Sequence, residues 1–162
     1  MKINKSIEQA IFVVIMLELE KGHRPLKAQV LSRNLGVSTT YLQKILARMV
    51  KAGIVRSSAS KDGGYTIARP ASEITIADIM DAVDTIRFDF DSQRLVKNLF
   101  GDDPHVAKAQ QQISDCIGNG IDAMHSELSN VSIEDLLLKD RDPNGSIEWE
   151  NRSGLGDDGY SH

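Results

Sequence analysis

The sequence contains a single cysteine, Cys116, and has few long apolar runs. One cysteine cannot form an intrachain disulfide, so we expect a reducing, cytoplasmic setting. The apolar run Ala10–Leu17 is too short to span a bilayer. It leads directly into Glu18 and Glu20, so we expect a buried helix here rather than a signal peptide.

The residue patterns of an enzyme are also missing. The sequence shows no Ser/His/Asp or Cys/His arrangement at usable spacing and no glycine-rich phosphate loop. The histidines lack metal-site spacing, and His105 with Asp102 and Asp103 is a poor ligand set, more typical of a loop and a helix start. We therefore expect neither an enzyme nor a metal site.

Charge is present but unevenly divided along the 162 residues, whose net charge is −4. Residues 1–69 contain twelve lysines and arginines against four acids, a net charge of +8. The remainder carries seven against nineteen, a net charge of −12. A basic half suits a polyanionic partner, and an acidic half repels one. The alternative is a chance fluctuation along a globular chain.

Within the basic half, three helical stretches are separated by short breaks. The first, about Ser6 to Lys21, has the broad apolar face of a central helix, and the second spans about Leu26 to Leu35. Gly36 suits a left-handed turn, and Ser38 suits an N-cap whose hydroxyl accepts an amide hydrogen bond. This order of parts predicts a helix-turn-helix.

The third stretch, about Thr39 to Ala52, is the candidate reading helix. One face is apolar, and the opposite face carries Thr40, Lys44, Ala47, Arg48 and Lys51, flanked by Tyr41 and Gln43. Recognition helices contact base edges near their N-terminus and contact phosphates through their cations. An ordinary solvated face is the alternative for any one side chain, but it explains the whole face less well.

Two short strands are expected after this helix, at Ile54–Ser58 and Tyr65–Arg69, joined by the turn Lys61-Asp62-Gly63-Gly64. Such a hairpin can place Lys61 at a minor groove, or it can simply cover the core. Thr75 and Asp78 then give a capping-box pattern before a short amphipathic helix. The predicted fold class is mainly α with a small β-hairpin.

Several segments together carry a resemblance to a known family. They are Ser38-Thr39-Thr40-Tyr41-Leu42, Lys51-Ala52-Gly53-Ile54-Val55, Gly63-Gly64-Tyr65 with Ala68-Arg69-Pro70, and Glu73-Ile74-Thr75-Ile76-Ala77-Asp78-Ile79 with Ala82-Val83. In this order they resemble the bacterial IscR/NsrR/CymR-type winged helix-turn-helix regulators, the Rrf-two family. The likeness covers most of residues 1 to about 84 and continues more weakly to Leu138.

The resemblance implies a homodimer that binds a roughly palindromic operator, with the third helix in the major groove and the wing at the minor groove. When the family's groove contacts are transferred position by position, the resemblance implies that they are made here by Ser38, Thr39, Thr40, Tyr41, Gln43 and Lys44. Lys61 and Gly63 become wing contacts, and Lys2 and Lys5 become candidates for contact with the DNA backbone.

One departure from the family pattern concerns iron. Cluster-binding members place three cysteines after the short helix, but the corresponding segment here, Asp84–Val106, contains none. An iron–sulfur cluster needs several thiolates or comparable ligands. We therefore predict a member without the cluster cysteines and without a cofactor. Some relatives carry an acid at the position of Gln43. The neutral amide here predicts an operator sequence that differs from theirs.

The second half is expected to assemble the dimer. From Val106 onward an apolar seam recurs at steps of three or four residues and includes Ile113, Ile117, Ile121, Met124 and Leu128. In the family the corresponding long helix builds the dimer, while packing against the chain's own winged domain is the alternative. Cys116, beside the seam, is a candidate redox reporter, although a buried or idle thiol is the commoner situation.

Three regions follow from these patterns. Residues 1–84 form the winged helix-turn-helix DNA-binding domain, and residues 85–139 hold a linker, the long dimerisation helix and a short terminal helix that begins at Ser132. Residues 140–162 are expected to form a flexible polar tail, with Trp149 a candidate for docking on the body or on a partner.

The protein is predicted to be a cytoplasmic, homodimeric repressor that binds double-stranded DNA and responds to a small-molecule or protein effector. The alternative is a winged-helix protein-interaction module that regulates a metabolic enzyme.

Overall fold

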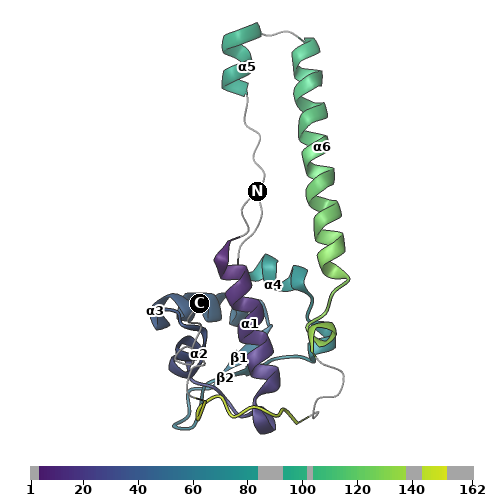
Figure 1. Ribbon diagram of the computed structural model, residues 1–162. Coiled ribbons are helices and arrows are strands. Elements are labelled where there is room, and N and C mark those ends of the chain that lie inside the picture. Colours follow the sequence, from purple (N-terminus) through teal and green to yellow (C-terminus); the bar gives the residue numbers. More distant parts are fainter. Residues whose placement is uncertain (1–3, 84–92, 102–103, 138–143, 153–162) are drawn as a thin grey trace, which may run out of the picture.

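The computed structural model describes residues 4–83, 93–101, 104–137 and 144–152. They form a helical body from which one long helix projects (Figure 1). Across these residues, no helix is both long and apolar enough to cross a membrane. In chain order the elements are α1 (Lys5–Leu19), η1 (Lys21–His23), α2 (Ala28–Leu35), α3 (Thr39–Lys51), β1 (Val55–Ser57), β2 (Tyr65–Ile67), η2 (Ala71–Glu73), α4 (Ile76–Val83), α5 (Gln93–Phe100), α6 (Pro104–Ser129) and η3 (Glu134–Leu136).

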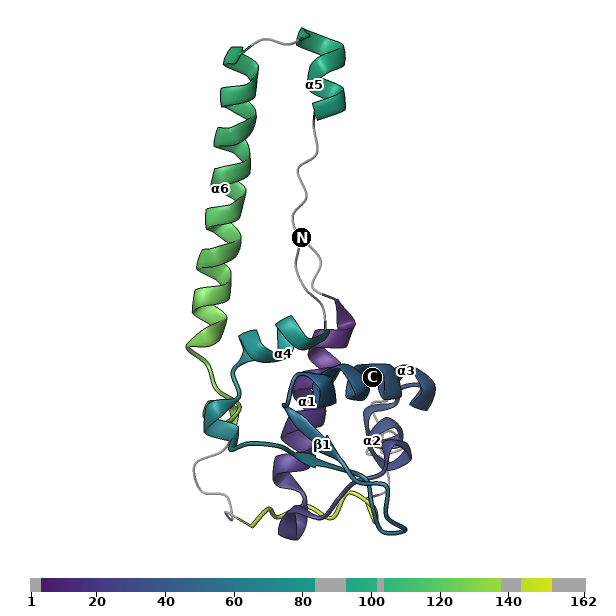
Figure 2. The ribbon, with the colours of Figure 1, turned by 180° about the vertical axis from the view of Figure 1, so that it is seen from behind.

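Helix α1 occupies the centre of the body, with α2 and α3 on one side of it (Figures 1 and 2). The Asn4 side chain caps its first turn by accepting a hydrogen bond from the Ser6 amide at 3.1 Å. Ala10 and Val14 are fully buried, because apolar residues extend around more than one face of this helix. The buried helix expected at Ala10–Leu17 is therefore present.

Helices α2 and α3 form the helix-turn-helix. Gly36 follows α2 with a φ of 65°, the left-handed conformation that glycine adopts without steric cost. The Gly36 and Val37 amides donate to carbonyl oxygens in the last turn of α2. Leu31 of α2 and Leu42 and Leu46 of α3 are fully buried, so packing fixes the direction in which α3 leaves the turn.

Strands β1 and β2 form the wing, an antiparallel hairpin in which Val55 pairs with Ile67. The wing is joined to Leu26 by two backbone hydrogen bonds: the Tyr65 amide donates to the Leu26 carbonyl oxygen at 2.8 Å, and the Leu26 amide donates to the Tyr65 carbonyl oxygen at 3.0 Å. Gly64 passes so close that a Cβ there would lie 2.6 Å from the Leu26 carbonyl oxygen. The wing is thus anchored to the segment that leads into α2.

Helix α4 starts with the predicted capping box. The Thr75 amide donates to Asp78 Oδ2 at 2.9 Å, and the Asp78 amide donates to Thr75 Oγ1 at 3.1 Å. Further along α4, Asp81 Oδ2 lies 2.9 Å from His125 Nε2 of α6. Beyond α6, Ile133 is fully buried in the core. Helix α6 is therefore attached to the body at one end and projects from it at the other (Figures 1 and 2).

The predicted fold class, mainly α with a small hairpin, is confirmed. The short terminal helix expected from Ser132 is present as the 3-10 turn Glu134–Leu136, and Leu137 after it is extended. Ser132 and Asp135 cap each other, with the Asp135 amide donating to Ser132 Oγ at 3.2 Å. Helix α5 has no counterpart among the sequence predictions.

Candidate nucleic-acid interface

Helix α3 separates its apolar and polar residues onto opposite sides. The apolar side is buried in the body and consists of Leu42, Ile45, Leu46 and Met49. The other side is exposed and carries the predicted contacts Thr40, Tyr41, Gln43, Lys44 and Lys51. Because the buried side holds the helix firmly, the exposed side is a rigid, polar and basic surface.

The start of α3 differs from the expectation at two side chains. Ser38 is the N-cap residue, as predicted, but among the described residues its hydroxyl makes no capping hydrogen bond, so that part of the prediction is wrong. Thr39 Oγ1 lies 2.7 Å from Ser32 Oγ, which ties α3 to α2 instead of presenting Thr39 outward. First-turn amides that Ser38 leaves uncapped suit an anion such as a DNA phosphate.

The two cations in the second half of α3 have different surroundings. Arg48 donates through Nη1 to the Val83 carbonyl oxygen at the end of α4. It therefore joins α3 to α4, and its predicted contact with DNA competes with this bond. Lys51 is exposed in the last turn, so Lys44 and Lys51 stay the predicted phosphate contacts of the helix.

The wing loop exposes Lys61 and buries Gly63. The Gly63 amide donates to the Ser60 carbonyl oxygen at 2.8 Å, and a Cβ at Gly63 would lie 2.3 Å from the Ser58 carbonyl oxygen. The structure thus gives Gly63 a role in closing the loop, and its contact with DNA stays a prediction. Lys61 stays a predicted wing contact.

Several other cations of the basic half are engaged within the body. Arg69 Nη2 lies 3.1 Å from Asp78 Oδ2, and Arg56 donates to a wing carbonyl oxygen at 3.3 Å. Lys5 is exposed in the first turn of α1, whereas Lys2 lies outside the described residues. Exposed lysines of the basic half lie on α3, at the wing tip, at the start of α1 and, as Lys27, just before α2.

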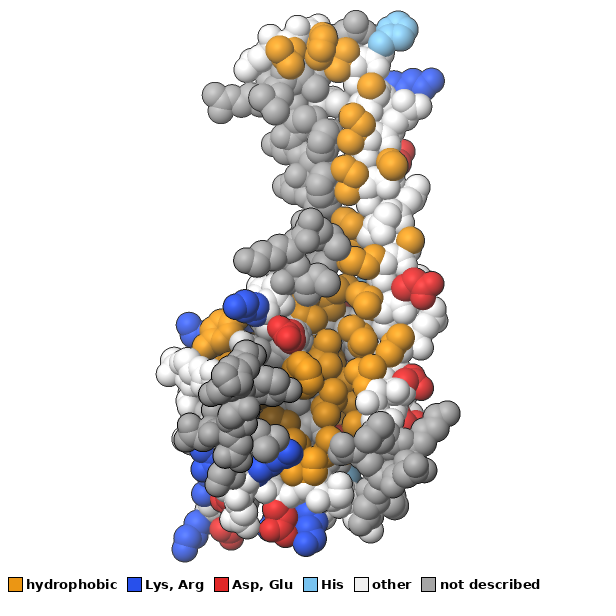
Figure 3. Space-filling view, in the orientation of Figure 1, with side chains coloured by type: hydrophobic (Ala, Val, Ile, Leu, Met, Phe, Trp, Pro, Cys, Tyr) orange, Lys and Arg blue, Asp and Glu red, His pale blue; other side chains and the backbone are white. Residues whose placement is uncertain are grey.

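The predicted dimerisation residues divide between two surroundings along α6. Met124 and Leu128 pack against the protein's own core, as the alternative interpretation required. Ile117 and Ile121 are half-buried, and Ile113 is 45% exposed. Figure 3 shows apolar side chains continuing along α6 from the body towards its far end. The projecting half of α6 therefore carries an apolar seam that is partly exposed, and its role in a dimer stays a prediction.

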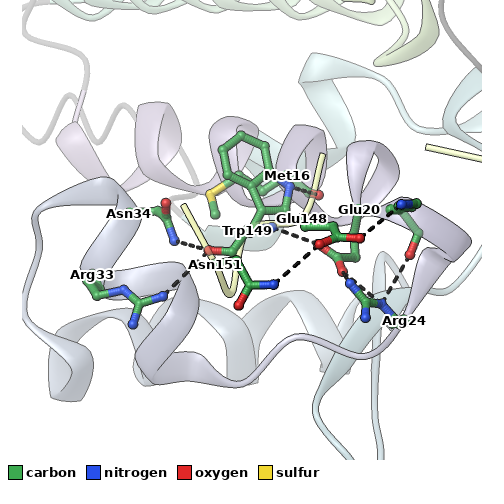
Figure 4. A network of polar contacts seen from close by, with 9 residues as sticks. Met16, Glu20, Arg24, Arg33, Asn34, Glu148, Trp149 and Asn151 are labelled. Atoms are coloured by element: carbon green, nitrogen blue, oxygen red, sulfur yellow. Dashed lines mark hydrogen bonds and ion pairs between the residues drawn. The ribbon is translucent and has the colours of Figure 1, made fainter. Parts of the chain in front are cut away.

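A segment near the C-terminus, residues 144–152, lies across the ends of α1 and α2 (Figure 4); we call it the strap. The Ile147 amide donates to the Leu19 carbonyl oxygen at 3.0 Å, and the Lys21 amide donates to the Ile147 carbonyl oxygen at 2.9 Å. Trp149 Nε1 donates to the Met16 carbonyl oxygen at 2.8 Å. The predicted docking of Trp149 on the body is confirmed, and these residues are held on the body where a flexible tail was expected. The tryptophan is the sequence signal for this docking.

A family profile described as Rrf2, iron-dependent transcriptional regulator, matches residues 3–139. The chain belongs to the Rrf2 family. The resemblance drawn from the helix-turn-helix, wing and short-helix segments is thereby confirmed. Membership in this family makes the protein a winged helix-turn-helix, DNA-binding regulator of transcription.

Individual relatives agree with this placement. YffB of Lactococcus lactis, named as an HTH-type transcriptional regulator, is 29% identical over 133 residues, which are 82% of this chain and 85% of the relative. The HTH-type transcriptional regulator IscR of Photorhabdus laumondii is 30% identical over 52% of this chain and 51% of its own length. Among solved structures, CymR of B. subtilis has a TM-score of 0.57 at 20% identity and covers 84% of this chain and 95% of its own, which supports the fold.

The family description raises the question of whether this Rrf2 protein can hold iron. Cys116 is its sole cysteine and is exposed on α6, so it is not buried, and the idle thiol and the redox reporter both stay open. Within the described residues, no group of three or more His, Cys, Asp or Glu side chains is arranged for a metal ion. A cluster held by several thiolates does not fit this set of donors.

Proposed function

We propose that this Rrf2 protein is a homodimeric repressor that reads a palindromic operator through α3 and the wing, without an iron–sulfur cluster. The observation that carries the proposal is the outward face of α3. Thr40, Gln43 and Lys44 are exposed there, on a helix whose opposite side is buried. Amide and hydroxyl groups near the start of a recognition helix read base edges, and lysines bind phosphates.

The seam on α6 supports the homodimer. Ile113 is exposed on a helix face that continues the apolar core of the body. A large exposed apolar face of this kind marks an interaction surface, and a second copy would cover it with the same seam. Two copies of α3 would then reach half-sites about 34 Å apart, one turn of the duplex, which accounts for a palindromic operator.

The proposed partners are double-stranded DNA, a second copy of the chain, and a small-molecule or protein effector. No catalytic role is part of the proposal. The proposed route for the signal is contact with such an effector or chemistry at the exposed Cys116.

Binding to random duplex DNA at low and moderate salt gives the first test. We expect binding that weakens steeply as salt rises, because each phosphate neutralised releases counterions. Selection from a random duplex library should then return an inverted repeat, and a reporter gene behind that site should fall in expression when the protein is present.

Each part of the proposal can fail separately. Absence of DNA binding at both salt concentrations would favour the protein-interaction module that regulates an enzyme. A selected site without symmetry would contradict the proposal that a homodimer binds the operator. A rise in reporter expression would make the protein an activator.

A further inference from the structure

The strap is a feature that the family match does not include. The Rrf2 profile ends at residue 139, whereas the strap comprises residues 144–152. It crosses from the end of α1 to the last turn of α2, and the close-up in Figure 4 shows both sets of contacts. A segment that joins these two helices can influence how the helix-turn-helix is held.

We propose that the strap is a positioning element for DNA recognition. It holds the last turn of α2, and through that turn the start of α3, in the orientation that reads an operator. This inference rests on the proposed DNA interface at α3. Trp149 and Asn34 are the positioning residues, and neither is expected to touch DNA.

On the α1 side, the strap is fixed by a buried carboxylate. Glu20 is 1% exposed; its Oε2 accepts a hydrogen bond from the Trp149 amide at 3.1 Å, and its Oε1 accepts one from Arg24 Nη2 at 2.7 Å. A buried charge is stable only where it is paired and hydrogen-bonded. Gly145 lets the strap approach this point, because a Cβ there would lie 2.2 Å from the Glu20 carbonyl oxygen.

On the α2 side, the strap is held by two consecutive residues of the last turn. Asn34 Nδ2 donates to the Trp149 carbonyl oxygen at 3.1 Å, and Arg33 Nη2 donates to the Glu150 carbonyl oxygen at 2.8 Å. The adjoining residue, Ser32, makes the link to α3. The strap and α3 are therefore hydrogen-bonded to neighbouring residues in the same turn of α2.

The Ser32 link completes the route from the strap to the reading helix. Ser32 Oγ lies 2.7 Å from Thr39 Oγ1, and the Ser32 carbonyl oxygen accepts the Val37 amide at 3.0 Å. Thr39 is the first residue of α3 and directly precedes Thr40, a predicted base contact. A shift of the last turn of α2 therefore moves the part of α3 where base contacts are made.

A competing idea is that the strap shields cations from DNA. Glu148 Oε1 does lie 2.9 Å from Lys21 Nζ. The contacts with α2, however, are made by strap carbonyl oxygens and not by carboxylates. The charge of Arg33 is therefore not neutralised there, and the geometry favours positioning over shielding.

The test compares affinities for the selected operator and for random duplex DNA of equal length. Asn34→Ala removes the amide link without changing charge, and Ser146→Ala is the matched control on the exposed side of the strap. We expect Asn34→Ala to lose about tenfold in operator affinity, the size of one lost base contact. Random-duplex affinity should stay within about twofold, and the control should match the wild type in both assays.

Substitution of Trp149 provides an independent arm. Trp149→Phe keeps an aromatic ring in the packing but loses the bond to the Met16 carbonyl oxygen, so it should retain most of the operator preference. Trp149→Ala should lose it. Circular dichroism at the assay temperature shows that each variant is folded before affinities are compared.

Two results would overturn the inference. Equal losses on operator and random duplex by a folded variant would mean that the strap does not act on base recognition, and gains on both would mean that the strap shields cations. If the wild-type protein binds neither duplex, the proposed function itself fails, and this is visible before any variant is made.

Discussion

Glu18, on α1, is a single residue whose titration the fold alters. Burial raises the pKa of the Glu18 carboxyl above its ordinary value of 4.5; His23 lowers it and Glu134 raises it by smaller effects. A carboxyl group whose folded pKa is raised favours folding below the unfolded pKa, and this contribution is lost as pH rises through the folded value.

Glu18→Gln should therefore raise the melting temperature at pH 7, where the charged carboxylate disfavours the fold. The gain should be smaller at pH 4, below the ordinary value of 4.5, because the carboxyl is then mostly protonated in both states. Thermal unfolding followed by circular dichroism at the two pH values measures this, with the exposed Glu127→Gln as control. An equal shift at both pH values would contradict the burial argument.

Two neighbours on α3 should affect DNA binding in different ways. Lys44→Ala should weaken binding to all duplexes and reduce the salt slope by about one, because a phosphate contact carries no sequence information. Gln43→Ala should instead change the preferred base at one position, by about 1–3 kcal/mol. Selection of bound sequences with each variant distinguishes the two, and a uniform loss for Gln43→Ala would refute its role in reading bases.

At this scale the sequence predicts which face of α3 is exposed, but not which side chains there are free. Helical spacing places Leu42 and Lys44 on different faces of α3. This can be predicted from the sequence because it depends only on the positions of the residues along the chain. The bonds of Thr39 to Ser32 and of Arg48 to Val83 depend on how other helices pack. Those partners become known only when the fold is known.

At the scale of elements, the wing is held by a close backbone approach at Gly64. Gly64→Ala would place a Cβ 2.6 Å from the Leu26 carbonyl oxygen, so the wing or the segment before α2 must shift. We expect a loss of about 1–3 kcal/mol in the free energy of unfolding.

Urea unfolding checks this, and Gly118→Ala in α6 is the matched control. Among the described residues, nothing lies within 4 Å of a Cβ placed at Gly118. Alanine in a helix interior is better than glycine by about 1 kcal/mol, so the control should be neutral or stabilised. Equal losses for the two variants would show that the approach to Leu26 is not what matters.

The strap shows where prediction of elements from sequence fails. Its composition, rich in small and polar residues, resembles that of a flexible tail. Its docking depends on a carbonyl of Met16 and on the carboxylate of Glu20, which α1 brings to one place. By contrast, the Thr75–Asp78 capping box is predictable, because both partners lie in one short segment.

At the scale of the whole molecule, α6 would connect DNA recognition to the proposed dimer. One end is held to α4 through His125 and Asp81, and Ile133 follows it into the core. The other end projects with its apolar seam exposed (Figures 1 and 3). If two such seams pair, the angle between the two reading helices is set by how firmly each α6 is attached to its own body.

Ile113→Glu tests this arrangement at the most exposed residue of the seam, which is 45% exposed and whose loss should leave the body folded. A charge buried without a partner should weaken the dimer by about 3 kcal/mol, roughly a hundredfold in its dissociation constant. Sedimentation at micromolar concentration should show monomers, and operator affinity should fall because one reading helix covers only half of the site. Asn119→Glu, exposed on the opposite side of α6, should leave both measurements unchanged. A dimer that survives Ile113→Glu but not Asn119→Glu would place the interface on the other face of the helix.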